Sequence, residues 1–399
     1  MKYPAAILIA LLSVLINNQV TAQDSLLTQL AKNNISYFTQ TQGAFSGAGW
    51  ETIVEQAQKS NFVLIGEDHF TNEIPLFTSA LSDRVKFDNF FCEIDPYSAK
   101  IIESKIKTNT EKQLDNYVAN YGNTFSFFAL RPEFVLIKNL VKHNTSIYGT
   151  DQIVSVADRL ICSELKKITQ DETARKVYET IEEQSKLYFE AFLKDQSQPF
   201  YLMTEAFEAN LAQLTLLKLS PEEKEKIEAL KLTAKIYKAQ DHHLRIQLMK
   251  NQLMKQYPEW RNKKNLFKFG AVHLAKGESL LKIYDLGNLI NNVADSKFQD
   301  ALHVMIVGKS GFQGSPFNGM PAQALDENNG DLSVLQPFFK AVKGEQWHNI
   351  DIRPIRKAIE EQHISVNNQE LLRIINGYDF VVIIPTVSAA QFPTQSTAQ

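Results

Sequence analysis

The sequence predicts an α/β protein with a mostly parallel central sheet flanked by helices and carrying a large helical insertion. The first observation behind this prediction is that short apolar runs alternate along the chain with segments whose apolar residues recur at helical spacing. Such alternation is typical of parallel strands covered by helices on both faces. The second observation is that residues 155–261 contain no strand candidate, only charged segments with apolar residues at helical spacing. We therefore expect this insertion to divide the sheet-forming sequence into two halves.

The apolar runs that we predict to be buried strands are each followed by glycine or polar turn residues. They are Asn61–Gly66, Asn89–Ile94, Thr145–Gly149, Leu266–Val272, His303–Gly308 and Phe380–Pro385. The helices predicted outside the insertion are Glu73–Leu81, Ala99–Ile106, Pro132–Val141 and Ser279–Leu289. Within the insertion, Ser220 followed by Pro221 predicts a helix start, because serine caps a helix N-terminus and proline is tolerated in the first turn.

The predicted organisation begins with a signal peptide at residues 1–22, in which Lys2 precedes the apolar run Ala5–Ile16 and Ala22 suits cleavage before Gln23. Residues 23–154 and 262–387 form the two halves of the α/β core around the insertion at 155–261, and residues 388–399 form a polar tail. We therefore expect an exported chain, periplasmic or secreted, with no integral membrane segment after cleavage.

Composition and charge narrow the class of partner. The net charge is −3, with acids and bases interspersed along 399 residues, which gives no electrostatic footprint for nucleic acid or an anionic membrane. We therefore expect a small-molecule or peptide substrate. The two cysteines, Cys92 and Cys162, are expected to be buried thiols rather than a disulfide, and neither is expected to be catalytic.

The most informative segment is Gly66-Glu67-Asp68-His69, which follows a β-branched run and precedes a predicted helix. Ligands bind beyond the carboxyl ends of parallel strands, so the segment presents Glu67 and His69 at the functional edge of the sheet. The alternative is a turn that caps the next helix, since Asp68 and Thr71 are good capping residues and acids favour a helix N-terminus.

A second segment, Gly270-Ala271-Val272-His273, repeats this arrangement at the end of another predicted strand. Packing of a hydrophobic core does not explain a histidine after both of these strands. We therefore predict that His69 and His273 lie in one site, within roughly 8 Å of each other. Two further strand ends bring acids to the same edge. Glu93 follows an apolar run, where an unpaired charge is costly, and Asp151 either joins the site or caps a helix that follows it.

These residues allow two mechanisms. His69, His273 and Glu93 match the nitrogen and oxygen ligands of a catalytic divalent metal, with Glu67 as the base for the metal-bound water. Without a metal, a histidine oriented by a carboxylate can itself activate water against an ester or amide. Either mechanism predicts a hydrolase. The sequence contains no Gly-x-Ser-x-Gly elbow, phosphate-binding loop or dinucleotide fingerprint.

The segment Lys309–Trp347 is rich in glycine and phenylalanine and follows a predicted strand. Because that strand ends at the same edge as the histidines, we predict a lid whose Phe312 and Phe317 contact the substrate. The alternative is a surface loop whose phenylalanines fill the core. His242 and His243, on a charged helical segment, are expected to face solvent.

At these residues the chain resembles the superfamily that groups erythromycin esterases, ChaN-type haem-binding proteins, and TraB and Tiki proteins. The opening Gly66-Glu67-Asp68-His69 is similar to that of ChaN and the erythromycin esterases, and Gly270-Ala271-Val272-His273 is similar to the second Gly-x-x-His of Tiki and TraB proteins. The resemblance spans about residues 50 to 385 and implies the erythromycin esterase-like, ChaN-like fold.

The resemblance implies that His69, His273, Glu67 and Glu93 line the site, and Arg245 and Met249 are similar to an arginine and a methionine on a helix of the erythromycin esterases. It implies a hydrolase of ester or peptide bonds, with a protein that binds haem or a related iron compound, as in the ChaN branch, as the alternative. The residues expected to bind substrate are Glu73, Asp151, Arg245, Phe312 and Phe317.

Overall fold

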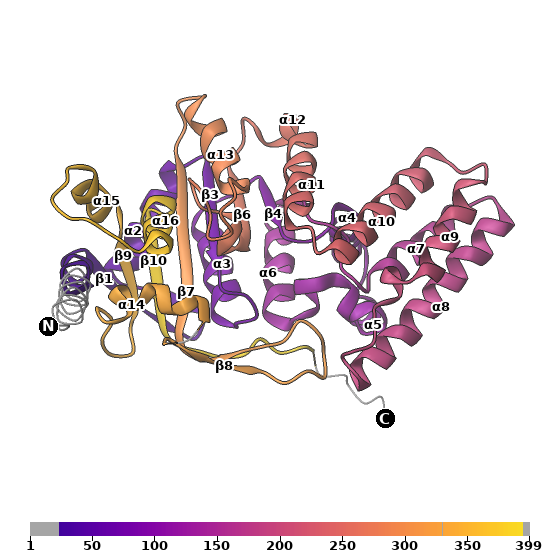
Figure 1. Cartoon of the computed structure of the whole chain (residues 1–399), viewed down its shortest axis with the longest axis horizontal. Helices are drawn as coiled ribbons and strands as arrows, with labels where there is room; N and C mark the ends of the chain where they lie inside the picture. Colours follow the sequence, from indigo (N-terminus) through magenta and orange to yellow (C-terminus); the bar gives the residue numbers. More distant parts are fainter. Residues whose placement is uncertain (1–23, 329, 394–399) are drawn as a thin grey trace, which may run out of the picture. The chain divides into compact units, whose positions relative to one another are not determined.

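The computed structural model describes residues 24–328 and 330–393, which form two compact units (Figure 1). The first unit comprises residues 24–68, Gly270–Phe312 and Ala324–Ser388, and the second comprises His69–Phe269, Gln313–Gln323 and residues 389–393. The predicted signal peptide lies outside the described residues. No helix within the described ranges combines the length and the apolar character that a membrane span needs.

The first unit contains a mixed sheet in the order β2-β1-β9-β10-β7-β3, with β8 paired to β7. The pairs β3–β7 and β7–β10 are parallel, whereas β10–β9, β9–β1 and β1–β2 are antiparallel. Glu67 is the last residue of β3 and lies opposite Ile306 of β7. The strand bounds are β1 Ile35–Thr41, β2 Ala44–Ser46, β3 Phe62–Glu67, β7 Ala301–Gln313, β8 Gln323–Asp326, β9 Trp347–Asp351 and β10 Phe380–Val387.

Apolar residues of these strands pack against the helices of the same unit. Val307 and Ile383 of the sheet lie in the same hydrophobic core as Phe338 and Ile374 of the helices. Burial of these apolar side chains away from water stabilises the packing of the helices on the sheet. The helices of this unit are α2 Ala48–Lys59, η3 Ala271–His273, α13 Leu286–Asp295, η4 Gly330–Leu335, α14 Gln336–Phe339, α15 Arg353–Glu360 and α16 Gln369–Gly377.

In the second unit the strand β4 (Asn89–Cys92) lies between β5 (Ser146–Gly149) and β6 (Asn265–Gly270), and both pairs are parallel. Cys92 lies opposite Gly149 on one side and opposite Lys268 on the other. The residues that follow β4 and β5 therefore emerge next to each other at one edge. The helices near these strands are α3 Glu73–Arg84, α4 Pro96–Thr108, α5 Glu111–Tyr121, η1 Gly122–Ala129 and α6 Arg131–Lys142.

The predicted helical insertion is confirmed: residues 155–261 contain helices and no strand. The helices of residues 158–239 pack on one another around Leu165, Tyr178 and Leu230, and Figure 1 shows them side by side. Ser220 and Glu223 form a capping box at the start of α10. The Ser220 hydroxyl accepts from the Glu223 N–H, and the Glu223 carboxylate accepts from the Ser220 N–H. The helices are α7 Asp158–Ile168, α8 Glu172–Lys194, η2 Tyr201–Met203, α9 Glu205–Thr215, α10 Pro221–Ala239, α11 His242–Lys255 and α12 Tyr257–Trp260.

One buried acid in the insertion titrates unusually. Asp158, the first residue of α7, is completely buried and accepts a hydrogen bond from the Ser185 hydroxyl at 2.5 Å. Burial raises the pKa of Asp158 from 3.8 to about 7, although the bond from Ser185 opposes this shift. The helix pair thus holds an acid that is partly protonated at neutral pH.

All six predicted strands form, with ends shifted by a few residues. The prediction missed β1, β2 and β9, which pair antiparallel at one side of the first-unit sheet. The predicted helix Ser279–Leu289 is wrong in its first half, because Lys282 has a φ of +59° and α13 begins only at Leu286, after its cap Asp285. Left-handed backbone of this kind interrupts a right-handed helix.

The segment Lys309–Trp347 is not one continuous loop. β7 runs on to Gln313 because its pairing with β10 continues as far as Gly311, opposite Val387. A short strand and two helical segments follow before Trp347 begins β9. The prediction that the cysteines are buried thiols rather than a disulfide is confirmed, since Cys92 and Cys162 are both buried and free.

Candidate functional site

The site in the second unit begins where β4 and β5 end. Glu93 directly follows β4, and Asp151 lies two residues after β5. The Asp151 N–H donates to the Ile94 carbonyl at 2.9 Å, so the two chain segments stay in contact beyond the strands. A Cβ at Gly149 would lie 2.3 Å from the Asp95 carbonyl oxygen, so only glycine permits this close approach.

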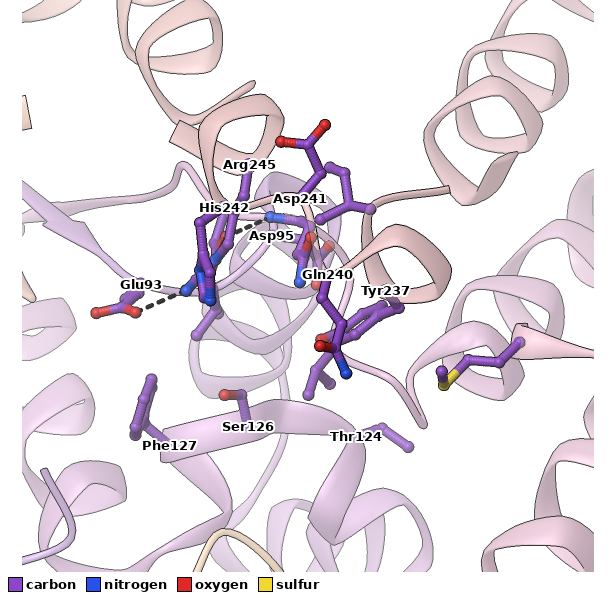
Figure 2. A pocket seen from close by; sticks show the side chains of 16 residues that line it. Glu93, Asp95, Thr124, Ser126, Phe127, Tyr237, Gln240, Asp241, His242 and Arg245 are labelled. Atoms are coloured by element: carbon purple, nitrogen blue, oxygen red, sulfur yellow. Dashed lines mark hydrogen bonds and ion pairs between the residues drawn. The ribbon is translucent and has the colours of Figure 1, made fainter. Parts of the chain in front are cut away.

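Arg245 joins these two acids. Its Nη2 donates to Glu93 Oε1 at 2.7 Å and to Asp151 Oδ2 at 2.5 Å, while its Nε donates to Asp151 Oδ1 at 2.9 Å (Figure 2). Although burial opposes its charge, Asp151 and Glu93 raise the pKa of Arg245 well above the usual range. Paired guanidinium and carboxylate groups of this kind hold each other in fixed positions. Arg245 therefore fixes the orientation of both acids.

His69 faces the other oxygen of Glu93. Its Nε2 lies 3.5 Å from Glu93 Oε2, and its side chain is 24% exposed against 7% for Glu93. The imidazole stacks on the Phe127 ring, with centroids 4.5 Å apart and planes 27° apart. Glu93 thus bridges a partly exposed histidine and a fixed arginine.

The backbone around His69 is held by residues far along the chain. Gln313 Nε2 donates to the His69 carbonyl at 2.7 Å, and the Phe70 carbonyl accepts from the N–H groups of Gly314 and Ala390. Phe70 itself has a φ of +64°, which is unfavourable for a bulky residue. A Cβ at Gly314 would come within 2.7 Å of the Ala390 carbonyl oxygen, so glycine is required there. These contacts hold the backbone of residues 69 and 70 in the conformation that places His69 next to Glu93.

A pocket of about 420 Å³ opens beside this network, and Glu93, Asp151 and Arg245 line it (Figure 2). Ser126 of η1 also lines it and has φ 52° and ψ −126°, values that are rare for residues other than glycine. The pocket wall therefore stores backbone strain, as binding sites often do.

Two titratable groups of the pocket are shifted by their surroundings. Burial raises the pKa of Asp95 to about 6, against the opposing bonds from Ser98 and Tyr97. Burial and then the negative charge of Asp151 raise the pKa of Tyr237 to about 12. Tyr237 therefore enters the pocket as a neutral phenol.

In the first unit the second motif forms a different pair. His273 Nδ1 lies 2.7 Å from Asp285 Oδ2, with both side chains nearly inaccessible, and Asp285 Oδ1 accepts from the Leu286 N–H at the start of α13. The Tyr378 hydroxyl donates to the Ala271 carbonyl within the same motif. Glu67, at the end of β3, is also buried.

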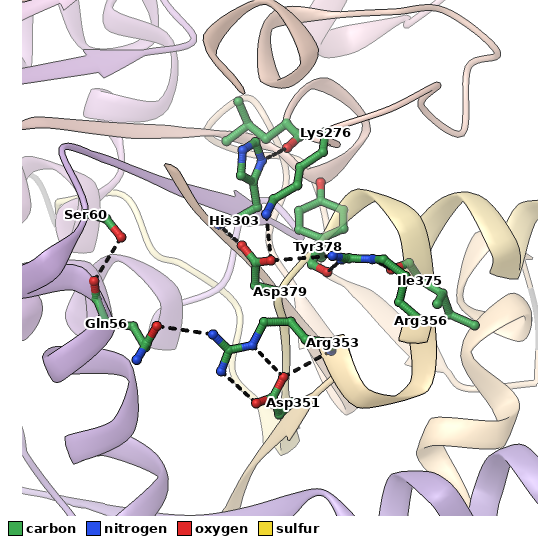
Figure 3. Close-up of polar contacts among 11 residues, drawn as sticks. Gln56, Ser60, Lys276, His303, Asp351, Arg353, Arg356, Ile375, Tyr378 and Asp379 are labelled. Carbon is green, nitrogen blue, oxygen red and sulfur yellow. Dashed lines mark hydrogen bonds and ion pairs between the residues drawn. The ribbon is translucent and has the colours of Figure 1, made fainter. Parts of the chain in front are cut away.

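The segment after His273 is held by a buried polar cluster (Figure 3). Lys276 Nζ donates to Asp379 Oδ1 at 2.6 Å, and the His303 N–H donates to Asp379 Oδ2 at 3.0 Å. His303 Nδ1 lies 2.7 Å from the Leu274 carbonyl, so this nitrogen carries the proton. Burial and then the charge of Lys276 lower the pKa of His303 to about 3. His303 is therefore a neutral structural residue of the first unit.

The structure brings together four of the residues singled out from the sequence: His69, Glu93, Asp151 and Arg245. The capping alternative for Asp151 is wrong, because the next helix begins only at Asp158. Glu73 is the first residue of α3, and Met249 is buried on α11.

The two lid phenylalanines lie in different surroundings and in different units. Phe312, near the end of β7, is 56% exposed. Phe317 is 8% exposed and packs against Phe189, Phe192 and Phe200. Their predicted contact with substrate stays a prediction.

Several residues of these sites were not found from the sequence. His242 is exposed, as expected, but it also lines the pocket together with Tyr237 and Gln152, which the sequence did not indicate. Asp285 could have been suspected as a helix cap, because it precedes Leu286 and an apolar periodic segment. Neither spacing nor composition indicates that Tyr237 and Gln152 share a pocket wall, since they lie on distant segments.

The donor set of the second unit does not suit a divalent metal. Within the described residues, no group of three or more His, Cys, Asp or Glu side chains is arranged to hold a metal ion. Glu93 Oε1 and both oxygens of Asp151 already accept hydrogen bonds from Arg245, so these oxygens are engaged and do not form an open ligand set. Binding of haem, the alternative named from the sequence, stays a prediction.

The sequence matches no protein-family model and no curated protein. Among solved structures, the chain is similar to a succinoglycan biosynthesis protein, with a TM-score of 0.55 at 13% identity over 93% of this chain and 99% of the other. It is also similar to a mutant of the erythromycin esterase EreC in its open conformation, with a TM-score of 0.53 at 14% identity over 86% of this chain and 94% of the other.

ChaN of Campylobacter jejuni with cofacially bound haem aligns over 69% of this chain and 91% of its own at 14% identity, but the TM-score of 0.33 supports no conclusion. The likeness to EreC and to the succinoglycan biosynthesis protein confirms the predicted erythromycin esterase-like α/β fold. At these identities it concerns the fold alone.

Proposed function

We propose that the chain is a hydrolase in which His69 and Glu93 activate water against an ester or peptide bond of a small-molecule or peptide substrate. The observation that supports this proposal is the approach of His69 Nε2 to within 3.5 Å of Glu93 Oε2, beside a pocket that Glu93 itself lines. A histidine next to a fixed carboxylate suits general-base catalysis, because the carboxylate stabilises the imidazolium that forms.

In the proposed reaction the His69 imidazole takes a proton from water, while Glu93 lies beside its Nε2. The water oxygen then bonds to the carbonyl carbon, the bond to the leaving oxygen or nitrogen breaks, and the imidazolium returns the proton to that leaving atom. Glu93 stays ionised through this cycle because Arg245 donates to its other oxygen at 2.7 Å. The stacked Phe127 ring limits rotation of the imidazole.

No step of this mechanism uses a metal. Participation of His273 and Glu67 in the reaction stays a prediction. The divalent metal that the sequence suggested also stays a prediction, and elemental analysis of the purified protein tests it. A stoichiometric metal, together with loss of hydrolysis in a chelator, would replace the metal-free mechanism.

The experiment that tests the proposal is hydrolysis of short-chain p-nitrophenyl esters and of a peptide library by the purified protein. His69→Gln should lower kcat/KM by about 100-fold or more, which is the usual contribution of a general base. Glu93→Gln should act in the same direction. The control is His243→Gln, because His243 is exposed on α11 and its Nε2 contacts only Gln247 among the bonds described. Unchanged hydrolysis by His69→Gln, or no hydrolysis by the unmodified protein, would contradict the proposal.

A further inference from the structure

The pocket beside Glu93 has a lining charge that its own residues do not balance. Four carboxylates line it, from Glu93, Asp95, Asp151 and Asp241, against one guanidinium, that of Arg245. Arg245 is shared between Glu93 and Asp151, so Asp95 and Asp241 have no Lys or Arg partner among the lining residues, where His242 is the other basic side chain. A pocket of this composition has a negative potential that favours a cationic group.

Two hydrogen-bonding atoms in the wall also point to a ligand. Gln152 is 8% exposed and Thr124 is fully buried, and both line the pocket. Gln152 Oε1 and Thr124 Oγ1 are buried and have no hydrogen-bond partner among the described residues, while the Gln152 side chain also bonds the Tyr237 hydroxyl. A buried acceptor without a partner costs about 1–3 kcal/mol, so such atoms in a pocket wall indicate donors supplied from outside the chain.

Aromatic surface completes the wall. The rings of Phe127 and Tyr237 line the same cavity (Figure 2). An organic cation is favoured by aromatic faces, and its carbon framework suits apolar surface. The lining thus combines negative charge, hydrogen-bond acceptors and aromatic rings around about 420 Å³.

We propose that this pocket binds the ammonium or guanidinium group of the substrate, with Gln152 Oε1 accepting its N–H bonds and Asp95 and Asp241 supplying the opposite charge. The substrate class is therefore an ester or amide that carries an organic cation. This assignment rests on the proposed function for the reaction, but the binding step is separate from hydrolysis.

The test uses three compounds of similar shape and different charge: tyramine as the cation, 4-ethylphenol as the neutral analogue and 4-hydroxyphenylacetate as the anion. Calorimetry is performed on the full chain carrying His69→Gln, so hydrolysis does not enter the measurement. Tyramine should bind at least about tenfold more tightly than either analogue, because one buried charge pair is worth a kcal/mol or more.

Two variants locate the binding. Asp95→Asn should weaken tyramine about tenfold while α4 stays capped, because asparagine caps a helix as well as aspartate does. Gln152→Met removes the acceptor at similar volume and should also weaken tyramine. Asp171→Asn is the matched control, since Asp171 caps α8 through the same pair of backbone bonds but lies outside the pocket lining.

Equal binding of the neutral analogue would overturn the proposal, as would tyramine binding that Asp95→Asn and Gln152→Met leave unchanged. Binding of calcium or magnesium ions in place of tyramine would make the pocket an inorganic cation site, and this would overturn it as well. Failure of the proposed hydrolase is distinguishable, because it is measured as absent ester or peptide cleavage while tyramine still binds.

Discussion

His69 and His273 follow their strands with the same Gly-x-x-His spacing, yet each faces its carboxylate through a different ring nitrogen and with different access to solvent. In the second unit, His69 presents Nε2 to Glu93 at 3.5 Å and is 24% exposed. In the first unit, His273 presents Nδ1 to Asp285 at 2.7 Å and is 4% exposed. The spacing fixes the position of the histidine after its strand, and the surroundings decide which ring nitrogen lies next to a carboxylate.

The difference in exposure and contacts indicates that His69 has a role in the reaction and His273 a role in stability. His69 lies beside a pocket wall, so its replacement should affect reaction more than folding. His273 and Asp285 form a close buried pair whose carboxylate also caps α13, so its replacement should affect folding. Removing one partner of a buried pair leaves the other polar group unpaired, which costs more than losing an exposed contact.

The first of the two largest expected effects separates these two histidines. His273→Ala should lower the free energy of unfolding by about 3 kcal/mol, because Asp285 then lies buried with a lost partner. His69→Ala should lower it by about 1 kcal/mol or less, since the contact is long and partly exposed. Urea unfolding of the two variants measures the difference. Equal losses would mean that both histidines have the same structural role.

A second comparison sets Phe317 of the second unit against Phe312 of the first. Phe317→Ala should cost about 3 kcal/mol of stability, because a buried aromatic ring leaves a cavity. Phe312→Ala should change stability by less than about 0.5 kcal/mol, because its ring is already exposed. Thermal unfolding of both variants, alongside substrate KM, measures this. If Phe317→Ala keeps its melting temperature and raises KM, Phe317 contacts substrate as the sequence predicts.

The smallest expected effect is a difference in pH dependence between the units. His303 has a pKa of about 3 when folded against an ordinary value of 6.5, so the unfolded chain takes up its proton first and His303 lowers stability as pH falls through 6.5. Asp158 has a pKa of about 7 when folded against 3.8, so the folded chain takes up the proton first and Asp158 raises stability as pH falls below 7.

Each group should contribute on the order of 1–2 kcal/mol between pH 7 and pH 5, with opposite signs. Relative to the unmodified protein, His303→Gln should therefore lose less stability on acidification, and Asp158→Asn should lose more or gain less. Urea unfolding at the two pH values measures both differences. Parallel pH profiles for all three proteins would show that neither group titrates as described.

Several features could be predicted from the sequence because they depend on neighbouring residues. The apolar runs became strands, the periodic segments of 155–261 became helices, and Ser220 with Glu223 formed a capping box. The sequence also indicated that His69 and Glu93 would lie at strand ends, although the predicted strand Asn89–Ile94 still included Glu93, which the structure places directly after β4.

Only the tertiary structure decided how these residues are paired. Arg245 reaches Asp151 across 94 positions and Glu93 across 152, and no local pattern encodes contacts over such separations. The same holds for Gln152 in the pocket wall and for Phe317 in its aromatic cluster. Strand β9 was missed because it gains its stability by pairing with β1 and β10, which the chain supplies from distant segments. Local propensity thus determined the strands and helices that pack through their own apolar pattern, whereas pairing between distant segments determined β1, β2 and β9 and the chemistry of the site.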